Sequence, residues 1–527
     1  MSAGAKARRA PTDRAPRAAG LLLHPTSLPG RFAIGDLGPG ATAMLEWMLE
    51  AGLSIWQILP LGPTGLGHSP YNSLSAFAGN PLLISPEALV TDQLLDPRLL
   101  ADGDSPPAAT VDFTDAARYK NRVLRAAFET HRRAPDGSLG RELAAFATAG
   151  RRRLWLDDWS LFAALRERHG ERSWIDWPAA LRDREPRALE AARLELAEPI
   201  AFQHFQQFIF FRQWRSLRRA ASAHGIRILG DVPIYVALDS ADVWAHRELF
   251  ELEPDGRPSA VAGVPPDYFS VDGQRWGNPL YRWQEMERTG YGWWMDRLAH
   301  ELERADLVRL DHFRGFVAYW RVAAKEKTAR RGRWVKGPGE KFFATARRRL
   351  GGLPFLAEDL GDIDEPVRRL RRKLGLPGMH VLQFAFAAED SLHAPHRHEA
   401  DAAVYTGTHD NDTTRGWLAS AGEDERNRAL TYLGAAPESI SWSMVRAALA
   451  SVAALALVPL QDLLDLGSEA RMNLPARASG NWTWRALHGD VPGTLPARLR
   501  ELVAATARLP PPPMPAVSPD GAPRPAG

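Results

Sequence analysis

Eight short apolar runs recur along the chain, and several of them end in Asp, Glu, His or Gly. The runs are Gly20–His24, Leu53–Leu61, Ile226–Val236, Ala305–Phe313, Pro354–Asp359, Met379–Phe386, Ala402–His409 and Ala454–Leu460. Their hydrophobicity is nearly continuous rather than alternating, which is typical of parallel strands buried on both faces. The pattern therefore predicts eight parallel strands.

Helical periodicity fills the segments between these runs. Within Ala41–Ala51, the side chains of Met44, Leu45 and Met48 fall on one face, and Glu365–Leu374 shows a similar stripe before a glycine. Eight strand–helix repeats predict an α/β fold, a (β/α)8 TIM barrel with inserted, largely helical subdomains. An open doubly wound sheet is the alternative, but the first strand is not followed by its Gly-rich G-x-G-x-x-G turn.

The spacing of the runs also predicts the domain organisation. The catalytic barrel is expected over residues 19–507, interrupted twice. Residues 85–200 are expected to form a largely helical insertion, because the gap is too long for one crossover. Residues 239–294 are expected to form a second insertion that is rich in Gly, Pro and aromatic residues, and a long loop of that composition is usually functional. Residues 1–18 and the Pro-rich residues 508–527 are expected to be disordered tails.

Composition narrows the function without identifying it. The 527 residues include 66 basic and 63 acidic side chains, a net charge of +3 that calls for no nucleic-acid partner. Cysteine is absent, which excludes disulfides, zinc–thiolate sites and cysteine nucleophiles. No apolar run approaches the ~18 residues of a membrane span. We expect a cytoplasmic protein with no membrane partner; the sequence leaves its oligomeric state open.

Acidic residues gather at the ends of the predicted strands. They are Asp231, Asp311, Glu358, Asp359 and Asp410, on the third, fourth, fifth and seventh runs. Barrel enzymes carry their chemistry at the C-terminal ends of the strands. A single Asp in such a place is usually a helix cap or an ion-pair partner, but a converging set predicts an active site. Two carboxylates are what glycoside chemistry requires, one to attack or stabilise the sugar cation and one to protonate the leaving oxygen.

Other chemistries fit less well. The cluster His409-Asp410-Asn411-Asp412 resembles metal ligands, but no metal-binding motif accompanies it, so we predict no catalytic metal. There is no G-x-S-x-G elbow, and the Gly-rich loop Gly62–Gly67 lacks the lysine of a phosphate-binding loop. The basic run Lys325–Arg349 could bind nucleic acid, but acidic residues and Gly-Pro interrupt it. We favour a solvated loop and helix there.

Several long motifs, all in one order, resemble the 4-α-glucanotransferase family, also called amylomaltase or disproportionating enzyme, which is glycoside hydrolase family 77. The motifs are HPTSLPG (24–30), SPYNSLSAFAGNP (69–81), GDVPIYVA (230–237), PPDYFS with GQRWGNP (265–279), RLDHFRG (309–315), AEDLG (357–361), YTGTHDNDT (405–413), PLQDLL, SEARMNLP and NWTWR (459–485). The likeness spans nearly the whole barrel and leaves out the tails and much of residues 85–200.

The resemblance implies a role for each residue at the strand ends. Asp311 would be the nucleophile that forms a covalent glucosyl-enzyme, and Glu358 would act first as the acid and then as the base. Asp410 would hold sugar hydroxyls and favour a distorted ring, with His409 beside it. Arg309, two residues before Asp311, would orient the nucleophile, because alternation along a strand places both side chains on one face.

The resemblance also implies substrate contacts outside these strands. Asp231 would support the donor-side sugar, and Tyr71 would stack under it. The insertion over residues 239–294 would be a lid over the active site. Tyr268, Gln274 and Trp276 would belong to this lid, and we expect Tyr268 and Trp276 to help hold the acceptor. The implied partners are α-1,4-glucans, as maltooligosaccharides or chains from starch or glycogen, together with glucose. No cofactor is implied.

Two features separate this chain from its relatives. Where relatives often carry an aromatic and an acidic residue, this chain has Leu66 and His68, and after RMNLP it has Ala476-Arg477 in place of a Gly-Thr pair. Neither position touches the expected chemistry. The alternatives to a transferase are an α-1,4-glucan hydrolase of the α-amylase type on the same barrel and a non-catalytic glucan-binding protein. The intact carboxylates argue against the second.

Overall fold

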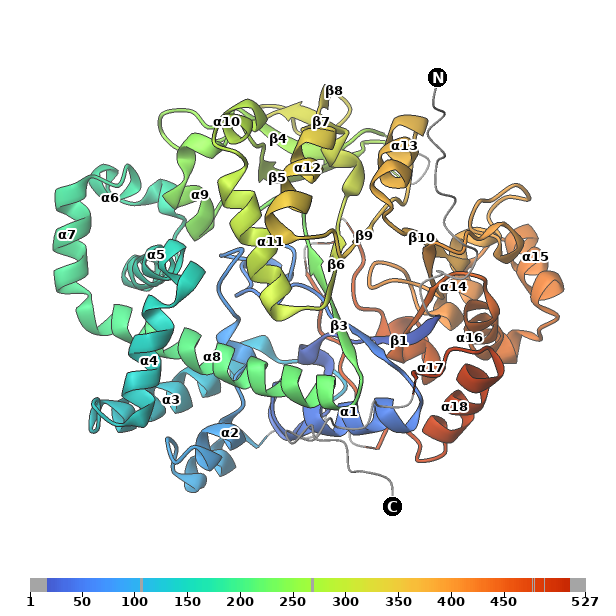
Figure 1. Ribbon diagram of the computed structural model, residues 1–527, viewed down its shortest axis with the longest axis horizontal. Coiled ribbons are helices and arrows are strands. Elements are labelled where there is room, and N and C mark those ends of the chain that lie inside the picture. The colour runs from blue at the N-terminus through green and yellow to red at the C-terminus, as the bar shows by residue number, and fades with distance from the viewer. Residues whose placement is uncertain are drawn as a thin grey trace, which may run out of the picture.

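The computed structural model describes residues 17–104, 108–266, 270–475, 477, 479–487 and 489–511. Eight parallel strands form one sheet in the order β10-β11-β12-β1-β2-β3-β6-β9 (Figure 1). The strands are β1 (Ala18–Leu22), β2 (Ile55–Gln57), β3 (Arg227–Val232), β6 (Leu307–Leu310), β9 (Phe355–Ala357), β10 (Gly378–Val381), β11 (Ala402–Tyr405) and β12 (Leu455–Pro459). Each of the eight apolar runs forms one strand, as predicted.

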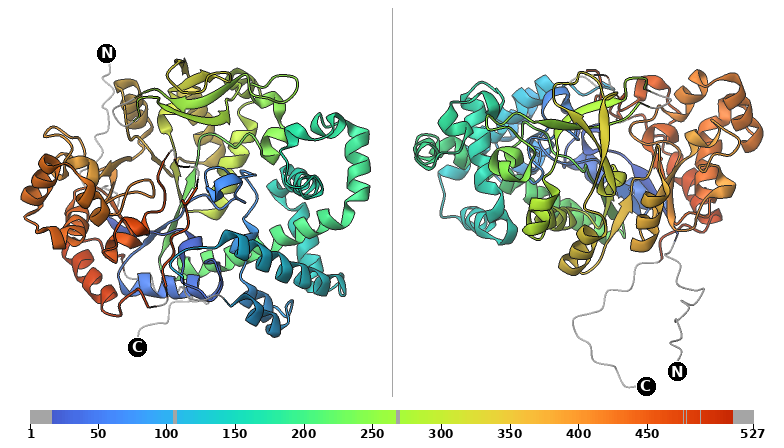
Figure 2. Two further views of the ribbon diagram at one scale, coloured as in Figure 1. Left: turned by 180° about the vertical axis from the view of Figure 1, so that it is seen from behind. Right: turned by 90° about the horizontal axis from the view of Figure 1, so that it is seen from above.

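The two ends of the sheet lie against each other. The amide of Ala357, in β9, donates to the carbonyl of Pro377 over 2.9 Å. The amide of Met379, in β10, donates to Oδ1 of Asp359 over 2.8 Å. The eight strands therefore curve into a nearly closed barrel, which the views in Figures 1 and 2 show with helices around it. The predicted (β/α)8 fold is confirmed.

The interior of the barrel has its own apolar core. Its buried members come from seven of the strands or their edges and are Ala18, Ile55, Leu229, Leu356, Met379, Val381, Ala403, Tyr405 and Leu457. At Gly20, a Cβ atom would lie 2.6 Å from both Ile55 and Leu457, so only glycine fits at this point of the barrel wall. A second, larger core fills the space between the strands and the surrounding helices.

Helices cover the outside of the barrel. They include α1 (Pro39–Glu50), α8 (Ala197–Ala223), α11 (Gly292–Arg304), α12 (Gly339–Leu350), α13 (Glu365–Leu374), α14 (Thr414–Ser420), α15 (Glu423–Leu433), α16 (Ile440–Ala450), α17 (Leu460–Leu463) and α18 (Leu495–Ala505). Two of these were predicted in detail. Helix α1 buries Met44, Leu45 and Met48, and α13 ends at Gly375, whose φ of 69° is a conformation that favours glycine.

A group of helices lies between β2 and β3, to one side of the barrel (Figure 1). These are α2 (Pro86–Thr91), α3 (Phe113–Arg132), α4 (Ser138–Thr148), α5 (Leu156–Arg168), α6 (Ala179–Arg182) and α7 (Pro186–Glu195), followed by the long helix α8. The residues described between 85 and 200 are thus mostly helical. Their status as a separate insertion stays a prediction.

A second sheet, which the sequence analysis did not anticipate, lies beyond β3 and β6. It has four antiparallel strands in the order β5-β4-β7-β8. The strands are β4 (Ala260–Val264), β5 (Gln274–Pro279), β7 (Ala318–Ala323) and β8 (Gly332–Lys336), with α9 (Ala241–Ala245) and α10 (Trp283–Arg288) on either side of β4 and β5 along the chain. The expectation of only a loop and helix over Lys325–Arg349 was incomplete. Strand β8 is partly exposed and carries basic residues. It therefore lacks the alternation of hydrophobic and polar residues that would have indicated a strand.

The chain ends are folded slightly further than predicted. Ala18 belongs to β1, although we placed it in the N-terminal tail. Arg508, which we placed in the C-terminal tail, is fully buried. Its guanidinium donates to the carbonyl oxygens of Ala18, Leu449, Ser451 and Ala453. The sequence did not indicate that Arg508 is buried, because the residues after it are rich in proline. A single arginine whose hydrogen bonds go to backbone carbonyls also produces no periodic pattern of hydrophobic residues. Residues 1–16 and 512–527 lie outside the described residues.

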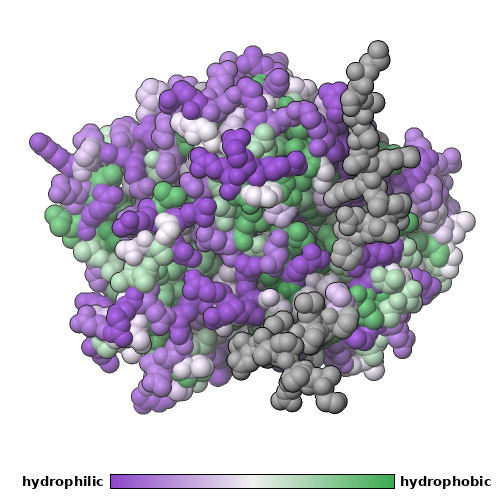
Figure 3. All heavy atoms as spheres, in the orientation of Figure 1, coloured by the Kyte–Doolittle hydropathy of each residue, from purple (hydrophilic) through white to green (hydrophobic). Residues whose placement is uncertain are grey.

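The surface and the helix lengths bear on the predicted location. Hydrophilic residues cover most of the face shown in Figure 3. Among the residues that the structure describes, no helix has both the length and the apolarity needed to cross a bilayer. The cytoplasmic location stays a prediction.

Candidate active site

Backbone hydrogen bonds between neighbouring strands bring the predicted carboxylates to one end of the barrel. Asp311 directly follows β6, and its amide donates to the carbonyl of Val232 in β3 over 3.0 Å. Glu358 directly follows β9, and its amide donates to the carbonyl of Leu310 over 3.0 Å. Because the strands are parallel, their C-terminal ends meet at the same mouth. Asp410 joins them from the loop that follows β11.

Arg309 connects two of these carboxylates. In the register of β3 against β6, Arg309 stands directly beside Asp231. Its Nη1 donates to both carboxylate oxygens of Asp231, over 2.9 and 2.7 Å, and its Nη2 lies 2.8 Å from Oδ1 of Asp311. The hydroxyl of Tyr71 completes the group by donating to Oδ2 of Asp231 over 2.7 Å. The structure therefore brings together the predicted Tyr71, Asp231, Arg309 and Asp311.

Electrostatics keep this arginine charged. Burial lowers the pKa of Arg309, but the carboxylates of Asp231 and Asp311 outweigh burial and raise that pKa above its usual value. Burial raises the pKa of the Asp231 carboxyl, and Arg309 acts in the opposite direction. A permanent cation thus sits between two carboxylates, one buried and one facing the barrel mouth.

Glu358 has the surroundings of an acid. Its carboxylate accepts hydrogen bonds from the amide of His312 over 2.8 Å and from the amide of Leu360 over 2.9 Å. These fix the position of the carboxyl group. Burial, helped by the charge of Asp311, nevertheless raises the pKa of Glu358 to about 7, although Arg309 opposes the shift. A substantial fraction of Glu358 is therefore protonated at neutral pH, as general-acid catalysis requires.

Asp410 and His409 adjoin this group of residues beside Tyr71. The Asp410 side chain is 48% exposed, and its Oδ1 lies 3.5 Å from Nε2 of His409. The His409 ring stacks on the ring of Tyr71, with centroids 5.0 Å apart and planes 16° apart. Burial lowers the pKa of His409, with Asp410 opposing, so the imidazole is neutral at pH 7. A neutral, stacked imidazole can donate or accept a hydrogen bond at a sugar hydroxyl.

Three residues that no sequence pattern singled out as site residues lie beside Asp410 and His409. Asn473 Nδ2 donates to Oδ1 of Asp410 over 2.6 Å, and Arg471 Nη2 donates to its backbone carbonyl over 2.7 Å. Trp482 lies 5.9 Å from the ring centroids of both Tyr71 and His409. All three fall within SEARMNLP and NWTWR, which were noted only as motifs. In the stretch ARMNLP (470–475), Arg471 and Asn473 are polar residues among apolar ones, and this was the available signal for two of the three.

The predicted lid residues lie partly within the described structure. Gln274 and Trp276 are in β5, and the indole Nε1 of Trp276 donates to Oε1 of Gln274 over 3.1 Å. The Trp276 ring packs edge-on against His312, the residue after Asp311, at 4.8 Å. Trp276 is 38% exposed, so part of its face is open to a ligand. Tyr268 lies outside the described residues.

Asp359 does not join the site. It receives the amide of Met379 and pairs with Arg371 over 3.0 Å, and it therefore helps to close the barrel wall. This is the ordinary structural role that a single strand-end aspartate is expected to have.

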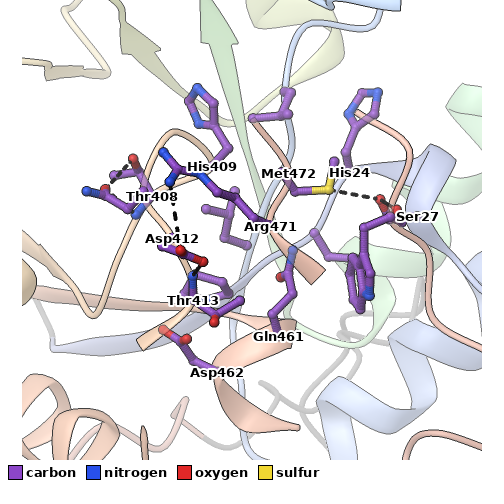
Figure 4. A pocket seen from close by; sticks show the side chains of 16 residues that line it. His24, Ser27, Thr408, His409, Asp412, Thr413, Gln461, Asp462, Arg471 and Met472 are labelled. Carbon is purple, nitrogen blue, oxygen red and sulfur yellow. Dashed lines mark hydrogen bonds and ion pairs between the residues drawn. The ribbon is translucent and has the colours of Figure 1, made fainter. Parts of the chain in front are cut away.

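A small cavity of about 30 Å³ lies behind His409, between the ends of β1, β11 and β12. Its lining includes His24, Thr408, Asp412 and Arg471, and Figure 4 shows their side chains around it. The space is enough for about two water molecules and too small for an organic cofactor. Within the part of the chain that the structure describes, no cluster of three or more His, Asp or Glu residues is arranged to hold a metal ion.

Comparisons with known sequences agree with this geometry. The model of the 4-alpha-glucanotransferase family, glycoside hydrolase family 77, matches residues 23–489. The chain is 50% identical over 508 residues to a 4-alpha-glucanotransferase of Thermus thermophilus, which covers 94% of this chain and 99% of that protein. It is 47% identical over 474 residues to a 4-alpha-glucanotransferase of a Synechocystis strain, covering 89% and 94%.

A solved structure gives the same result. The amylomaltase from Streptococcus agalactiae in complex with acarbose superimposes with a TM-score of 0.90 at 36% identity, covering 94% of this chain and 100% of that one. The amylomaltase from Corynebacterium glutamicum shares the fold, with a TM-score of 0.74 at 18% identity. These matches favour a transferase over the hydrolase alternative, and the chain belongs to the 4-alpha-glucanotransferase family of enzymes, glycoside hydrolase family 77.

Proposed function

We propose that this enzyme transfers an α-1,4-glucan segment to the 4-hydroxyl of an acceptor glucan or glucose, with retention, through a covalent glucosyl-enzyme on Asp311. The observation that supports this most directly is the contrast between the two carboxylates. Asp311 is paired with the guanidinium of Arg309, while burial and the charge of Asp311 raise the pKa of Glu358 to about 7. One group is set up to attack and the other to donate a proton.

The first half-reaction breaks the glycosidic bond. Glu358 gives its proton to the glycosidic oxygen as Oδ of Asp311 attacks the anomeric carbon. The bond from that carbon to the oxygen breaks, and the reducing-end segment leaves with the proton. The rest of the donor stays attached to Asp311 as an ester, with the configuration at the anomeric carbon inverted.

The second half-reaction reverses these roles. The acceptor 4-hydroxyl gives its proton to the Glu358 carboxylate, and its oxygen attacks the anomeric carbon. The bond to Asp311 breaks, so both carboxyl groups return to their starting states. Two inversions give net retention.

The surrounding residues would hold the donor sugar. Arg309 would keep Asp311 in place, and Asp231 would support the donor through the same network. Tyr71 would stack under the sugar, since its ring is already held by His409. Asp410, half exposed at the mouth, would bind hydroxyls more tightly in the distorted ring of the transition state than in the relaxed chair.

The choice between transfer and hydrolysis would depend on what occupies the acceptor side. Trp276 borders His312, one residue from the proposed nucleophile, and its indole N–H donates to Gln274. An aromatic face there would favour a sugar over water, because it stacks on the apolar face of the ring and excludes solvent. We propose that Tyr268 and Trp276 act together in this way.

The test is to incubate the purified enzyme with maltotriose and to follow both the sugar profile and the total reducing ends. A transferase gives glucose and a ladder of longer maltooligosaccharides, with reducing ends constant. Rising reducing ends without longer products would identify the hydrolase instead. Trp276→Ala should lower the ratio of transfer to hydrolysis, and an unchanged ratio would remove Trp276 from the acceptor site.

The covalent step has its own test. In Glu358→Gln, a glucosyl fluoride can still react, because fluoride leaves without protonation, whereas a natural acceptor is no longer deprotonated. We expect the ester to accumulate and the mass of the peptide that contains Asp311 to rise by one glucosyl unit. Asp311→Asn is the control, and labelling that survives this substitution would contradict the proposed nucleophile.

A further inference from the structure

A second cavity, of about 240 Å³, lies away from the candidate active-site residues Asp311 and Glu358. It is bordered by helices α8 and α11 and by the short helix η5 (Gly150–Leu154), and Figure 1 shows α8 and α11 side by side. The indole Nε1 of Trp214 in α8 donates to the carbonyl of Arg304 in α11 over 3.1 Å, which joins the two helices at the cavity. Its charged lining consists of Arg152, Arg215, Arg218, Arg219, Arg304 and the two acids Glu303 and Asp306.

The sequence of α8 places several of these groups on one face. Positions 211, 215, 218 and 222 are separated by four, three and four residues, so they line up along the helix. Ser222 adds a hydroxyl at the end of the row. A helix C-terminus attracts basic side chains through its dipole, but that effect is confined to the last turn. Arg215 lies about two turns before the end of the helix, so the dipole does not account for it.

The arginines outnumber the acids that could neutralise them. Arg218 pairs with Asp306, and Arg304 pairs with Glu301 from its own helix. Arg152 approaches Glu303 only to 3.7 Å. Arg215 and Arg219 make no hydrogen bond or ion pair with any residue that the structure describes. The cavity therefore carries an excess of positive charge with no internal partner.

Arg215 and Arg219 are exposed, so their guanidinium groups are accessible to a ligand from solvent. Oxygens of an anion bound in the cavity would relieve the electrostatic repulsion among the guanidinium groups that line it.

The position of the cavity separates it from the glucan site. Asp306 immediately precedes β6, whose other end carries Asp311. Its amide donates to the carbonyl of Ile228, near the start of β3. The cavity is thus at the N-terminal end of the barrel strands, opposite the mouth where the donor would bind. A neutral glucan carries no negative charge that would pair with the arginines of this cavity.

We propose that this cavity is a binding site for a phosphorylated small molecule, held through its phosphate oxygens by Arg215, Arg219 and Arg152. Guanidinium groups match phosphate in charge and in the geometry of paired hydrogen bonds. The cavity is a local hollow with two carboxylates at its edge, whereas nucleic acid is bound along extended basic surfaces. The geometry therefore favours a small ligand over a polynucleotide.

The test is calorimetric titration of the full chain with inorganic pyrophosphate and, separately, with inorganic phosphate, at low salt. We expect saturable binding of pyrophosphate. The double variant Arg215→Ala/Arg219→Ala should weaken it about tenfold or more, which corresponds to about 1.4 kcal/mol. The matched control Arg187→Ala/Arg446→Ala removes two exposed helical arginines elsewhere and should leave binding unchanged. Unchanged disproportionation of maltotriose by both variants verifies that they are folded.

A variant with higher affinity is also expected. Glu303→Gln removes a carboxylate from the lining of the cavity and should tighten pyrophosphate binding. Any of the following results would overturn the proposal: no saturable binding to the parent chain, equal weakening in the control variant, or an oligonucleotide that binds more tightly than pyrophosphate and is lost in the same double variant. Competition by maltotriose would also overturn it, because it would place the anion at the glucan site.

Discussion

Arg309 allows the sharpest test of how the active site is built. It donates to Asp231 over 2.9 and 2.7 Å and contacts Asp311 over 2.8 Å, all from a buried position. Arg309→Met keeps much of the side-chain length and removes every one of these contacts. Two carboxylates then face each other without a cation between them, and the Tyr71 hydroxyl is the remaining partner of Asp231.

The size of the effect follows from the burial of the network. Removing one partner of a buried ion pair typically costs about 3–5 kcal/mol, because the other charge stays desolvated. If that loss falls on the transition state, kcat/KM should decrease about 10²- to 10⁴-fold, at 1.36 kcal/mol for each factor of ten. Arg309 also lowers the pKa of Glu358. Its removal should therefore raise that pKa and move the alkaline limb of the activity profile to higher pH.

The assay is disproportionation of maltotriose between pH 5 and 9, together with urea unfolding. Arg371→Met is the matched control, since Arg371 is also buried and pairs with two carboxylates, Asp359 and Glu399, each over 3.0 Å. We expect both variants to lose stability and only Arg309→Met to shift the alkaline limb. If Arg309→Met keeps kcat/KM within about fivefold of the parent, or leaves the limb in place, the assignment of Arg309 to the reacting carboxylates is wrong.

Three further outcomes are expected. In the parent enzyme, kcat/KM should decline above about pH 7, because the acid form of Glu358 is lost there, and a flat profile up to pH 9 would contradict its role. Lys120→Met should lower the free energy of unfolding by about 3–5 kcal/mol, since Lys120 and Asp36 form a buried pair, and Lys120→Met/Asp36→Leu should recover much of that loss in urea titrations. Burial lowers the pKa of His380 to about 3 and that of His393 to about 4, so both stay neutral in the folded chain while the unfolded chain takes up protons below about pH 6.5. Stability should therefore be complete above that pH and decline as the pH falls toward 4, and His380→Asn/His393→Asn should flatten this part of the stability profile.

Local sequence was sufficient for the framework of the barrel and for the positions of several candidate site residues. Strands buried on both faces must be apolar throughout, so each of the eight runs could be read directly from the chain. The C-terminal ends of parallel strands lie at one mouth of a barrel, so the sequence alone predicts that Asp231, Asp311 and Glu358 lie together. Alternation along the strand predicted that Arg309 and Asp311 share a face, but it could not predict the pairing with Asp231. The strand register places Arg309 directly beside Asp231.

The rest depended on contacts between distant parts of the chain, which leave no periodic signal. Asn473 and Trp482 reach the site from a segment more than sixty residues beyond Asp410 along the chain, and Trp482 does so with a φ of 64°, a conformation that no residue pattern indicates. The four-stranded sheet joins the segment after β3 to the segment after β6. The arginine-lined cavity exists only because α8, α11 and η5 meet. Sequence determined which residues are buried or charged; tertiary packing decided which charges share a site, because electrostatic partners are set by distance in space.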